Sequence, residues 1–101
     1  MIFLILVSDR PDQLQRRLHH RPSHRAYWNA LGDRLKLAGP MTTDGNPDAT
    51  SKGSFFLLDA DSADHARRLV ADDPFTIEGI FGSDVRIEQV SPGLGAWLPG
   101  A

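Results

Sequence analysis

Cysteine is absent from the 101-residue sequence, which excludes disulfide bonds, thiolate metal sites and cysteine nucleophiles. An excess of one charge is also lacking, because 11 basic and 13 acidic side chains leave a net charge of −2. This balance gives no electrostatic footprint for a nucleic acid. The longest apolar run, residues 2–7, is far shorter than the ~20 residues that cross a bilayer, and it lacks the flanks of a signal peptide. We therefore expect a cytoplasmic protein without a membrane segment.

The residues that are present have the composition of a folded domain. Hydrophobic residues make up 41% of the chain, and the length suits one domain. The last ten residues combine Pro, Gly and Trp without a periodic pattern. We predict a single domain over residues 1–91, followed by an irregular tail over 92–101.

Four segments have the patterns of β-strands. Residues 2–7 and 55–58 are continuous apolar runs, as expected for strands that are buried on both faces. Residues 35–38 and 84–90 alternate apolar and polar side chains, which indicates strands with one covered face. Residues 41–52 are rich in turn-forming residues and predict a polar loop.

Helical spacing of apolar residues follows the first strand. It predicts helices over residues 11–19 and 22–34, with Pro11 and Pro22 in their first turns, where a missing N–H costs nothing. The two pieces could also form one kinked helix.

A further helix lies between the third and fourth strands. Asp61 or Ser62 can cap its beginning, and Pro74 is expected to end it. The element order is then β-α-β-β-α-β, an α+β arrangement of the ferredoxin-like type with an antiparallel four-stranded sheet. Its first and third strands are central, in agreement with their apolar character.

Two helices can cover only one face of such a sheet. Apolar side chains on the other face of the central strands then need a second cover, because large exposed apolar patches mark interfaces. We therefore predict a homodimer in which two sheets pack face to face. The alternative is that the tail covers this face within one subunit, through Leu94, Trp97 and Leu98.

Among the four histidines, His24 is the candidate for chemistry. It is expected in the first turn after Pro22, where the helix dipole keeps an imidazole neutral. A neutral imidazole can act as a base when a carboxylate holds its other nitrogen, and Asp73 is the candidate carboxylate. An Asp before a Pro is also a common helix end, so local spacing alone does not assign these roles.

The other histidines have plainer explanations. His19 and His20 suit a surface corner, and His65 suits a solvated helix face. A zinc site through His20 and His24 would need one continuous helix and a third ligand, and neither is evident from the sequence. We therefore expect no metal.

Three short motifs lie along this pattern: Arg21-Pro22-x-His24, Ala38-Gly39-Pro40 and Asp73-Pro74-Phe75. In their order and spacing, over residues 1 to about 91, they resemble the YciI-like (YCII-related) family. The resemblance implies a dimeric α/β-barrel of two ferredoxin-like subunits, with a pocket that faces a His and an Asp. By motif position the catalytic pair would be His24 and Asp73. The remaining motif residues would bind substrate: Arg21, Gly39, Pro40 and Phe75.

These observations favour an enzyme without a cofactor. His24, oriented by Asp73, would remove a proton from a small cyclic or aromatic-derived molecule, and the outcome would be isomerisation or elimination, such as loss of HCl. Tyr27 and Trp28 could add apolar wall. The alternative is a non-catalytic small-molecule binding or sensing module, in which His24 and Arg21 recognise an anionic group. Haem ligation by a pocket histidine is a third possibility, whereas the lack of basic residues on the central strands argues against RNA binding.

Overall fold

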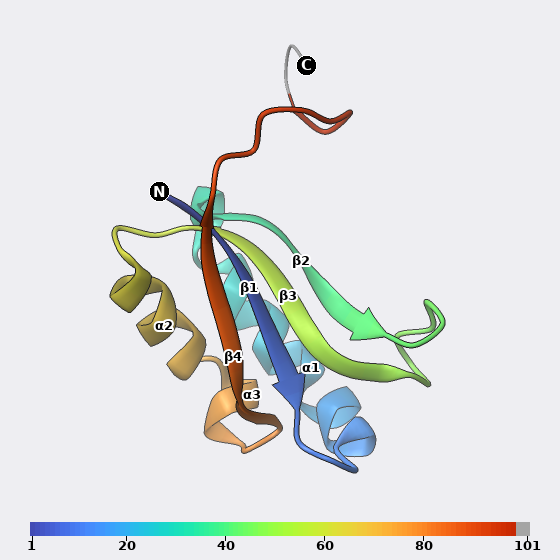
Figure 1. Cartoon of the computed structure of the whole chain (residues 1–101). Coiled ribbons are helices and arrows are strands. Elements are labelled where there is room, and N and C mark those ends of the chain that lie inside the picture. The colour runs from blue at the N-terminus through green and yellow to red at the C-terminus, as the bar shows by residue number, and fades with distance from the viewer. Residues whose placement is uncertain (99–101) are drawn as a thin grey trace.

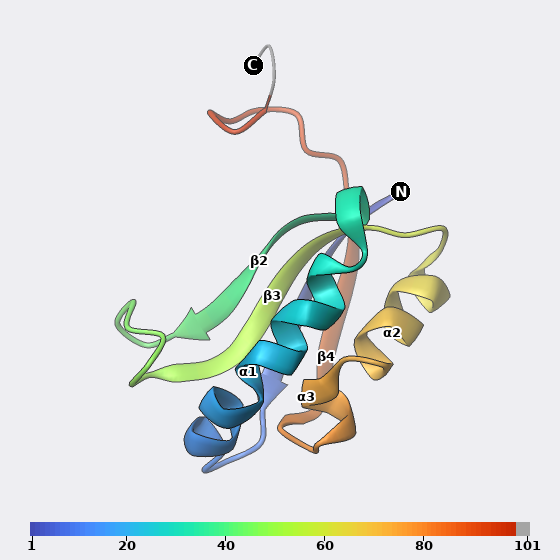
Figure 2. The same ribbon diagram turned by 180° about the vertical axis from the view of Figure 1, so that it is seen from behind.

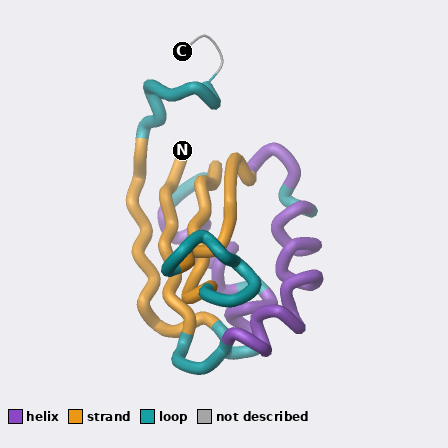
Figure 3. Tube along the Cα trace, turned by 90° about the vertical axis from the view of Figure 1, so that its right-hand side faces the viewer, coloured by secondary structure: helices purple, strands orange, loops and turns teal. Residues whose placement is uncertain are grey.

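The computed structural model describes residues 1–98 and has two layers, with a sheet on one side and helices on the other (Figures 1 and 3). The strands are β1 (Ile2–Asp9), β2 (Leu35–Thr42), β3 (Ser51–Asp59) and β4 (Phe81–Val90). The helices are α1 (Leu14–Asn29), the 3-10 turn η1 (Gly32–Arg34), α2 (Ala63–Ala71) and α3 (Pro74–Ile77). The sheet is antiparallel in the order β2-β3-β1-β4, which confirms the α+β, ferredoxin-like prediction.

All four predicted strands are present, and each is longer than its apolar pattern. β2 and β3 continue as a paired hairpin past their apolar residues, with irregular register near Leu35 and near Met41. The predicted polar loop therefore shrinks to residues 43–50, because backbone pairing continues through polar residues that no hydrophobic pattern marks.

The first helical region forms one continuous helix, so the prediction of two helices over residues 11–19 and 22–34 is wrong, and the alternative of a single helical unit is confirmed. Pro22 lies inside α1, and Pro11 lies in the turn ahead of it. An internal proline removes one helical hydrogen bond and usually costs about 3 kcal/mol. Arg17 before Pro22 and Trp28 after it are both buried, so contacts with the rest of the protein hold the helix on both sides of the proline. His24 therefore lies mid-helix, and the dipole argument from a helix N-terminus does not apply to it.

The second helical region is divided differently from the prediction. Ser62 caps α2 as expected, since its hydroxyl accepts a hydrogen bond from the His65 N–H. α2 already ends at Ala71, and Pro74 begins α3 instead of ending a helix. Proline is favoured at this first helical position because its missing N–H would have no partner there.

The main core lies between the sheet and the helices (Figure 2). Alternate residues of β1 point into it, with Phe3, Ile5 and Val7 buried. Phe56 and Leu58 of β3 lie beside them in register. None of the helices in residues 1–98 is both long enough and apolar enough to cross a membrane.

The opposite face of the sheet, here called the open face, carries a second set of apolar side chains. Leu4 pairs with Leu57, and Leu6 pairs with Phe55, on the side away from the helices. All four are only partly buried. Leu94 and Trp97 leave them uncovered, because these side chains are 93% and 83% exposed and the chain after β4 extends away from the sheet (Figure 1). The alternative in which the tail covers the open face is therefore wrong for Leu94 and Trp97, whereas Leu98, the third residue that it named, is partly buried.

Candidate active site

His24 and Asp73 lie in direct contact although 49 residues separate them in the sequence. The Nδ1 atom of His24 is 2.9 Å from both carboxylate oxygens of Asp73. An ionised carboxylate only accepts hydrogen bonds, so the proton of the neutral ring belongs on Nδ1 and the lone pair on Nε2. The structure therefore brings the two residues that the sequence paired into direct contact.

Asp73 is completely buried, and backbone and side-chain donors fix its orientation. The indole Nε1 of Trp28 donates to Oδ2 over 2.7 Å, and the backbone N–H of Phe75 donates to Oδ1 over 2.9 Å. The latter bond makes Asp73 the N-cap of α3. One side chain thus begins a helix and also contacts the imidazole, so the helix cap and the contact with His24 occur together at Asp73.

Aromatic rings hold the other side of His24. Its ring stacks on Phe75 with centroids 4.0 Å apart and planes 9° apart. The ring of Phe81 stands perpendicular to the imidazole, with the two centroids 6.3 Å apart. With 13% of its side chain exposed, His24 is held between protein groups and still reaches a cavity.

The cavity lies between α1 and β2 and has a volume of about 290 Å³. For scale, a cavity of about 150 Å³ is large enough for benzene. A molecule with one ring and a few substituents therefore fits the space. The cavity is lined by five of the residues that the sequence predicted for the site: His24, Arg21, Gly39, Pro40 and Phe75. The remaining lining residues are Arg17, Arg25, Trp28, Asn29, Leu35, Ala38 and Ser51.

Gly39 serves the sheet as well as the cavity. A Cβ atom at this position would lie 3.0 Å from Cε1 of Phe55, which is tighter than ordinary side-chain contact. The absence of a side chain therefore leaves room for the Phe55 ring on the open face. Gly39 contributes backbone to the cavity wall, in agreement with its place in the motif.

Arg17 is a buried residue of the site that the sequence did not indicate. Its Nη1 donates to both oxygens of Asp9 over 2.9 and 3.1 Å, and its Nη2 donates to Oγ of Ser54 over 2.6 Å. The guanidinium also lies 4.8 Å from the centre of the Phe75 ring. Burial lowers the pKa of Arg17 and raises that of Asp9, with each charge opposing the shift of the other. Arg17, Arg21 and His24 are spaced so that they share one side of a continuous helix. If a continuous helix had been assumed, this spacing would have placed Arg17 beside His24 at the cavity.

Tyr27 and Trp28 have separate roles. Trp28 lines the cavity as expected, whereas Tyr27 is not among the lining residues. The Tyr27 hydroxyl donates instead to the backbone carbonyl of Leu69 over 2.5 Å and ties α1 to α2. Burial, together with nearby Asp72 and Asp73, raises the pKa of Tyr27 to about 12.

The other histidines lie apart from this arrangement. His20 faces Glu78 at 3.9 Å and packs edge-on against His19. His65 accepts a hydrogen bond at Nδ1 from the backbone N–H of Asp61. Within residues 1–98, no group of three or more His, Asp or Glu side chains is placed to hold a metal ion.

Comparison with known proteins assigns the chain to a family. The model of the YCII-related domain matches residues 1–90, which contain every element and site described above. The chain belongs to the YCII-related family. The expectation that the sequence motifs raised is thereby confirmed.

Two curated relatives are each named protein YciI, one from Escherichia coli O6:H1 and one from Shigella flexneri. Each is 35% identical to this chain over 86 residues, which cover 80% of this chain and 88% of the relative. A solved structure of 5-chloro-2-hydroxyhydroquinone dehydrochlorinase (TftG) from Burkholderia phenoliruptrix, in complex with 2,5-dihydroxybenzoquinone, is also similar. It is 35% identical with a TM-score of 0.83, and the match covers 92% of this chain and 96% of that one. This YCII-related protein therefore shares fold and family with a dehydrochlorinase that binds a small aromatic-derived molecule.

Proposed function

We propose that this protein is an enzyme that removes a proton from a small single-ring molecule, and that His24 is the base. The observation that supports this most is the contact of Nδ1 of His24 with both oxygens of the buried Asp73, at the wall of a cavity. Asp73 orients the ring, and Nε2 is left to meet the substrate. The proton then resides on Nε2, and the resulting imidazolium is stabilised by the carboxylate behind it.

The similar dehydrochlorinase favours an elimination as the overall reaction. In such a step His24 takes one proton, the electron pair left behind moves into the ring system, and chloride departs with the pair of the carbon–chlorine bond. The balance is loss of HCl, and it requires no electron acceptor. An isomerase would use the same first step and return the proton at another atom.

Chloride release from 5-chloro-2-hydroxyhydroquinone is a direct test. We expect turnover by the unsubstituted protein, and a loss of about 10²–10⁴-fold in His24→Gln, the usual contribution of a positioned base. Arg67→Gln is a suitable control, since Arg67 is exposed on α2 and does not line the cavity. Equal chloride release by the unsubstituted protein and by His24→Gln would exclude His24 as the base. Binding of the compound without release of chloride would favour the non-catalytic binding module.

We further propose that two copies associate through the open face. The partly buried Leu4, Leu6, Phe55 and Leu57 form a contiguous apolar surface by strand register. Leu37 extends it, since it pairs with Leu57 and is exposed. Contiguous apolar surface of this kind is typical of an association surface. A second copy presents the same surface and forms an isologous pair.

A further inference from the structure

The cavity beside His24 is lined by positive charge alone. Arg17, Arg21 and Arg25 line it, and none of its lining residues in the described part of the chain is Asp or Glu. The whole chain has a net charge of −2, so this concentration of positive charge is local. It arises because α1 contains four arginines and no acidic residue. A cleft lined by one sign of charge, with apolar walls, concentrates ligands of the opposite sign.

The three arginines differ in how far their charge is already matched. Arg17 is matched by Asp9 through two hydrogen bonds in the interior. Arg21 is matched by Asp48 of the 43–50 loop through one bond of 2.9 Å, but Asp48 is 71% exposed. Exposed ion pairs of this kind contribute little to the stability of the fold and separate easily. Arg21 is therefore available to another anion at small cost.

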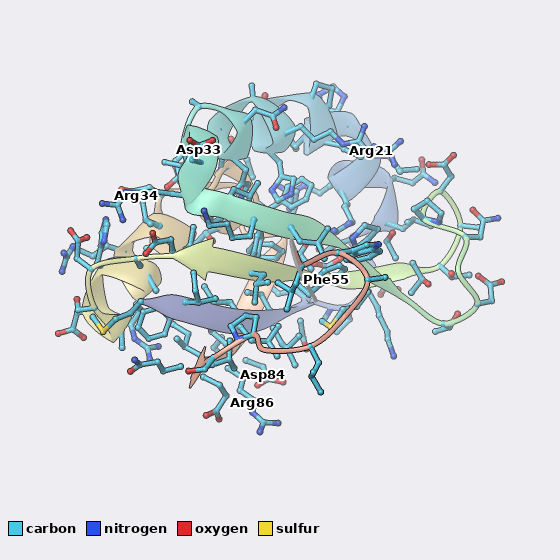
Figure 4. All side chains as sticks on the ribbon, turned by 90° about the horizontal axis from the view of Figure 1, so that it is seen from above. Arg21, Asp33, Arg34, Phe55, Asp84 and Arg86 are labelled. Atoms are coloured by element: carbon cyan, nitrogen blue, oxygen red, sulfur yellow. The ribbon has the colours of Figure 1, made fainter. Side chains whose placement is uncertain are left out.

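Arg25 stands one helical turn from Arg21 on the same side of α1. It is exposed and lines the cavity, and no ion pair within residues 1–98 includes it. Residues four apart on a helix are neighbours on its surface, so the two guanidinium groups can meet one anionic group. Figure 4 places Arg21 in the helix layer, on the side of the sheet opposite Arg86.

We propose that the cavity binds a single-ring organic anion, with a carboxylate or ionised hydroxyl group of the ligand at Arg21 and Arg25. Asp48 competes with this group for Arg21. The position of the ring beside His24 rests on the proposed function, whereas the preference for an anion does not require turnover.

The test uses two probes of nearly the same size and shape, the anionic 2,5-dihydroxybenzoate and the neutral 2,5-dihydroxybenzamide, with binding measured by calorimetry. We expect the carboxylate to bind about fivefold to tenfold more tightly than the amide, as for charge-assisted hydrogen bonds at a partly exposed site. Arg25→Gln and Arg21→Gln should each reduce this ratio to about twofold or less. Added salt should reduce it as well.

Asp48→Asn gives a result of opposite sign. Removal of the competing carboxylate frees Arg21, so affinity for the benzoate should rise about threefold while affinity for the benzamide stays unchanged. Arg67→Gln makes the same charge change as the arginine variants, away from the cavity, and should leave both affinities unaltered. A merely structural role for Arg21 and Arg25 would not produce this combination.

Several outcomes would overturn the inference: no binding of the benzoate, equal affinities for the two probes, or an undiminished preference in both arginine variants. The proposed function fails separately. If the preference is found and chloride release does not depend on His24, the anion site stands and the proposed reaction falls. If chloride release depends on His24 and the two probes bind equally, the reaction stands and the anion site falls.

Discussion

The indole N–H of Trp28 donates a 2.7 Å hydrogen bond to the buried carboxylate of Asp73. Trp28 lies one turn after His24 on α1, and both side chains reach the same carboxylate. Asp73 thereby fixes α1 against α3, at the point where the imidazole meets the cavity. The stability of the fold and the orientation of the candidate base depend on the same group.

Replacement of Trp28 by Phe should lower the stability of the fold and loosen the orientation of His24. The variant keeps an aromatic ring for stacking on Phe56 but removes one donor to a buried carboxylate. We expect the free energy of unfolding to fall by about 1.5–3 kcal/mol, as for hydrogen bonds to charged groups. Denaturant unfolding measures it, with Trp97→Phe as control. Trp97 is exposed, so the control should change stability by less than about 0.5 kcal/mol.

Replacement of Arg17 by Leu should destabilise the protein through Asp9. The variant leaves a buried carboxylate without its cation, which typically costs about 3–5 kcal/mol. Joint replacement of Arg17 and Asp9 by Leu removes both charges and should restore much of this loss. A double-mutant cycle in urea measures the coupling. Additive losses from the two single variants would show that the pair does not act as a unit.

Tyr27 should make stability depend on pH in alkaline solution. Its pKa is raised from 10.0 to about 12, so the folded state retains this proton when the unfolded chain has lost it. Stability should therefore fall as pH rises from about 10 to about 12, relative to Tyr27→Phe, which has no proton to lose. Phenolate absorbance follows the group directly, because Tyr27 is the single tyrosine. A midpoint of phenolate absorbance near the ordinary value of 10.0 would contradict a Tyr27 hydroxyl that is half-buried and hydrogen-bonded.

A charge on the open face should separate the proposed dimer. The chain has a mass of 11.1 kDa, so light scattering should give twice this value for the unsubstituted protein and a single mass for Leu57→Arg. Ile77→Arg is the matched control, since Ile77 is an exposed apolar residue of α3 in the helix layer. A monomeric unsubstituted protein would contradict the proposed association.

The order of the strands could be predicted because central and edge strands differ in their pattern of apolar residues. The central strands β1 and β3 each contain a continuous apolar run with apolar side chains on both faces, whereas β4, at one edge, alternates Val85 and Ile87 with polar residues. For α1, the sequence left two possibilities open, two short helices or one continuous helix, and it did not decide between them. Pro22 is locally a helix breaker, and only packing on the sheet side overrides it.

The site could be predicted in part. The pairing of His24 with Asp73 was supported by the family motifs, because no local sequence pattern relates two residues that are 49 positions apart. Arg17 was missed because its partner Asp9 ends a strand, and their contact depends on how β1 leads into α1. The role of Asp73 as a helix cap is visible in the Asp-Pro pair, but α3 is too short to show helical spacing.

The tautomer of His24 tests the central claim most directly. Long-range nitrogen–proton NMR should show the proton on Nδ1 of His24, at a pH where the ring signals no longer move. His65 is an internal control with the opposite tautomer, because its Nδ1 accepts the Asp61 N–H. Asp73→Asn should abolish the preference of His24 and leave His65 unchanged. A His24 ring protonated on Nε2 in the unsubstituted protein would contradict the account, since no lone pair would then face the cavity.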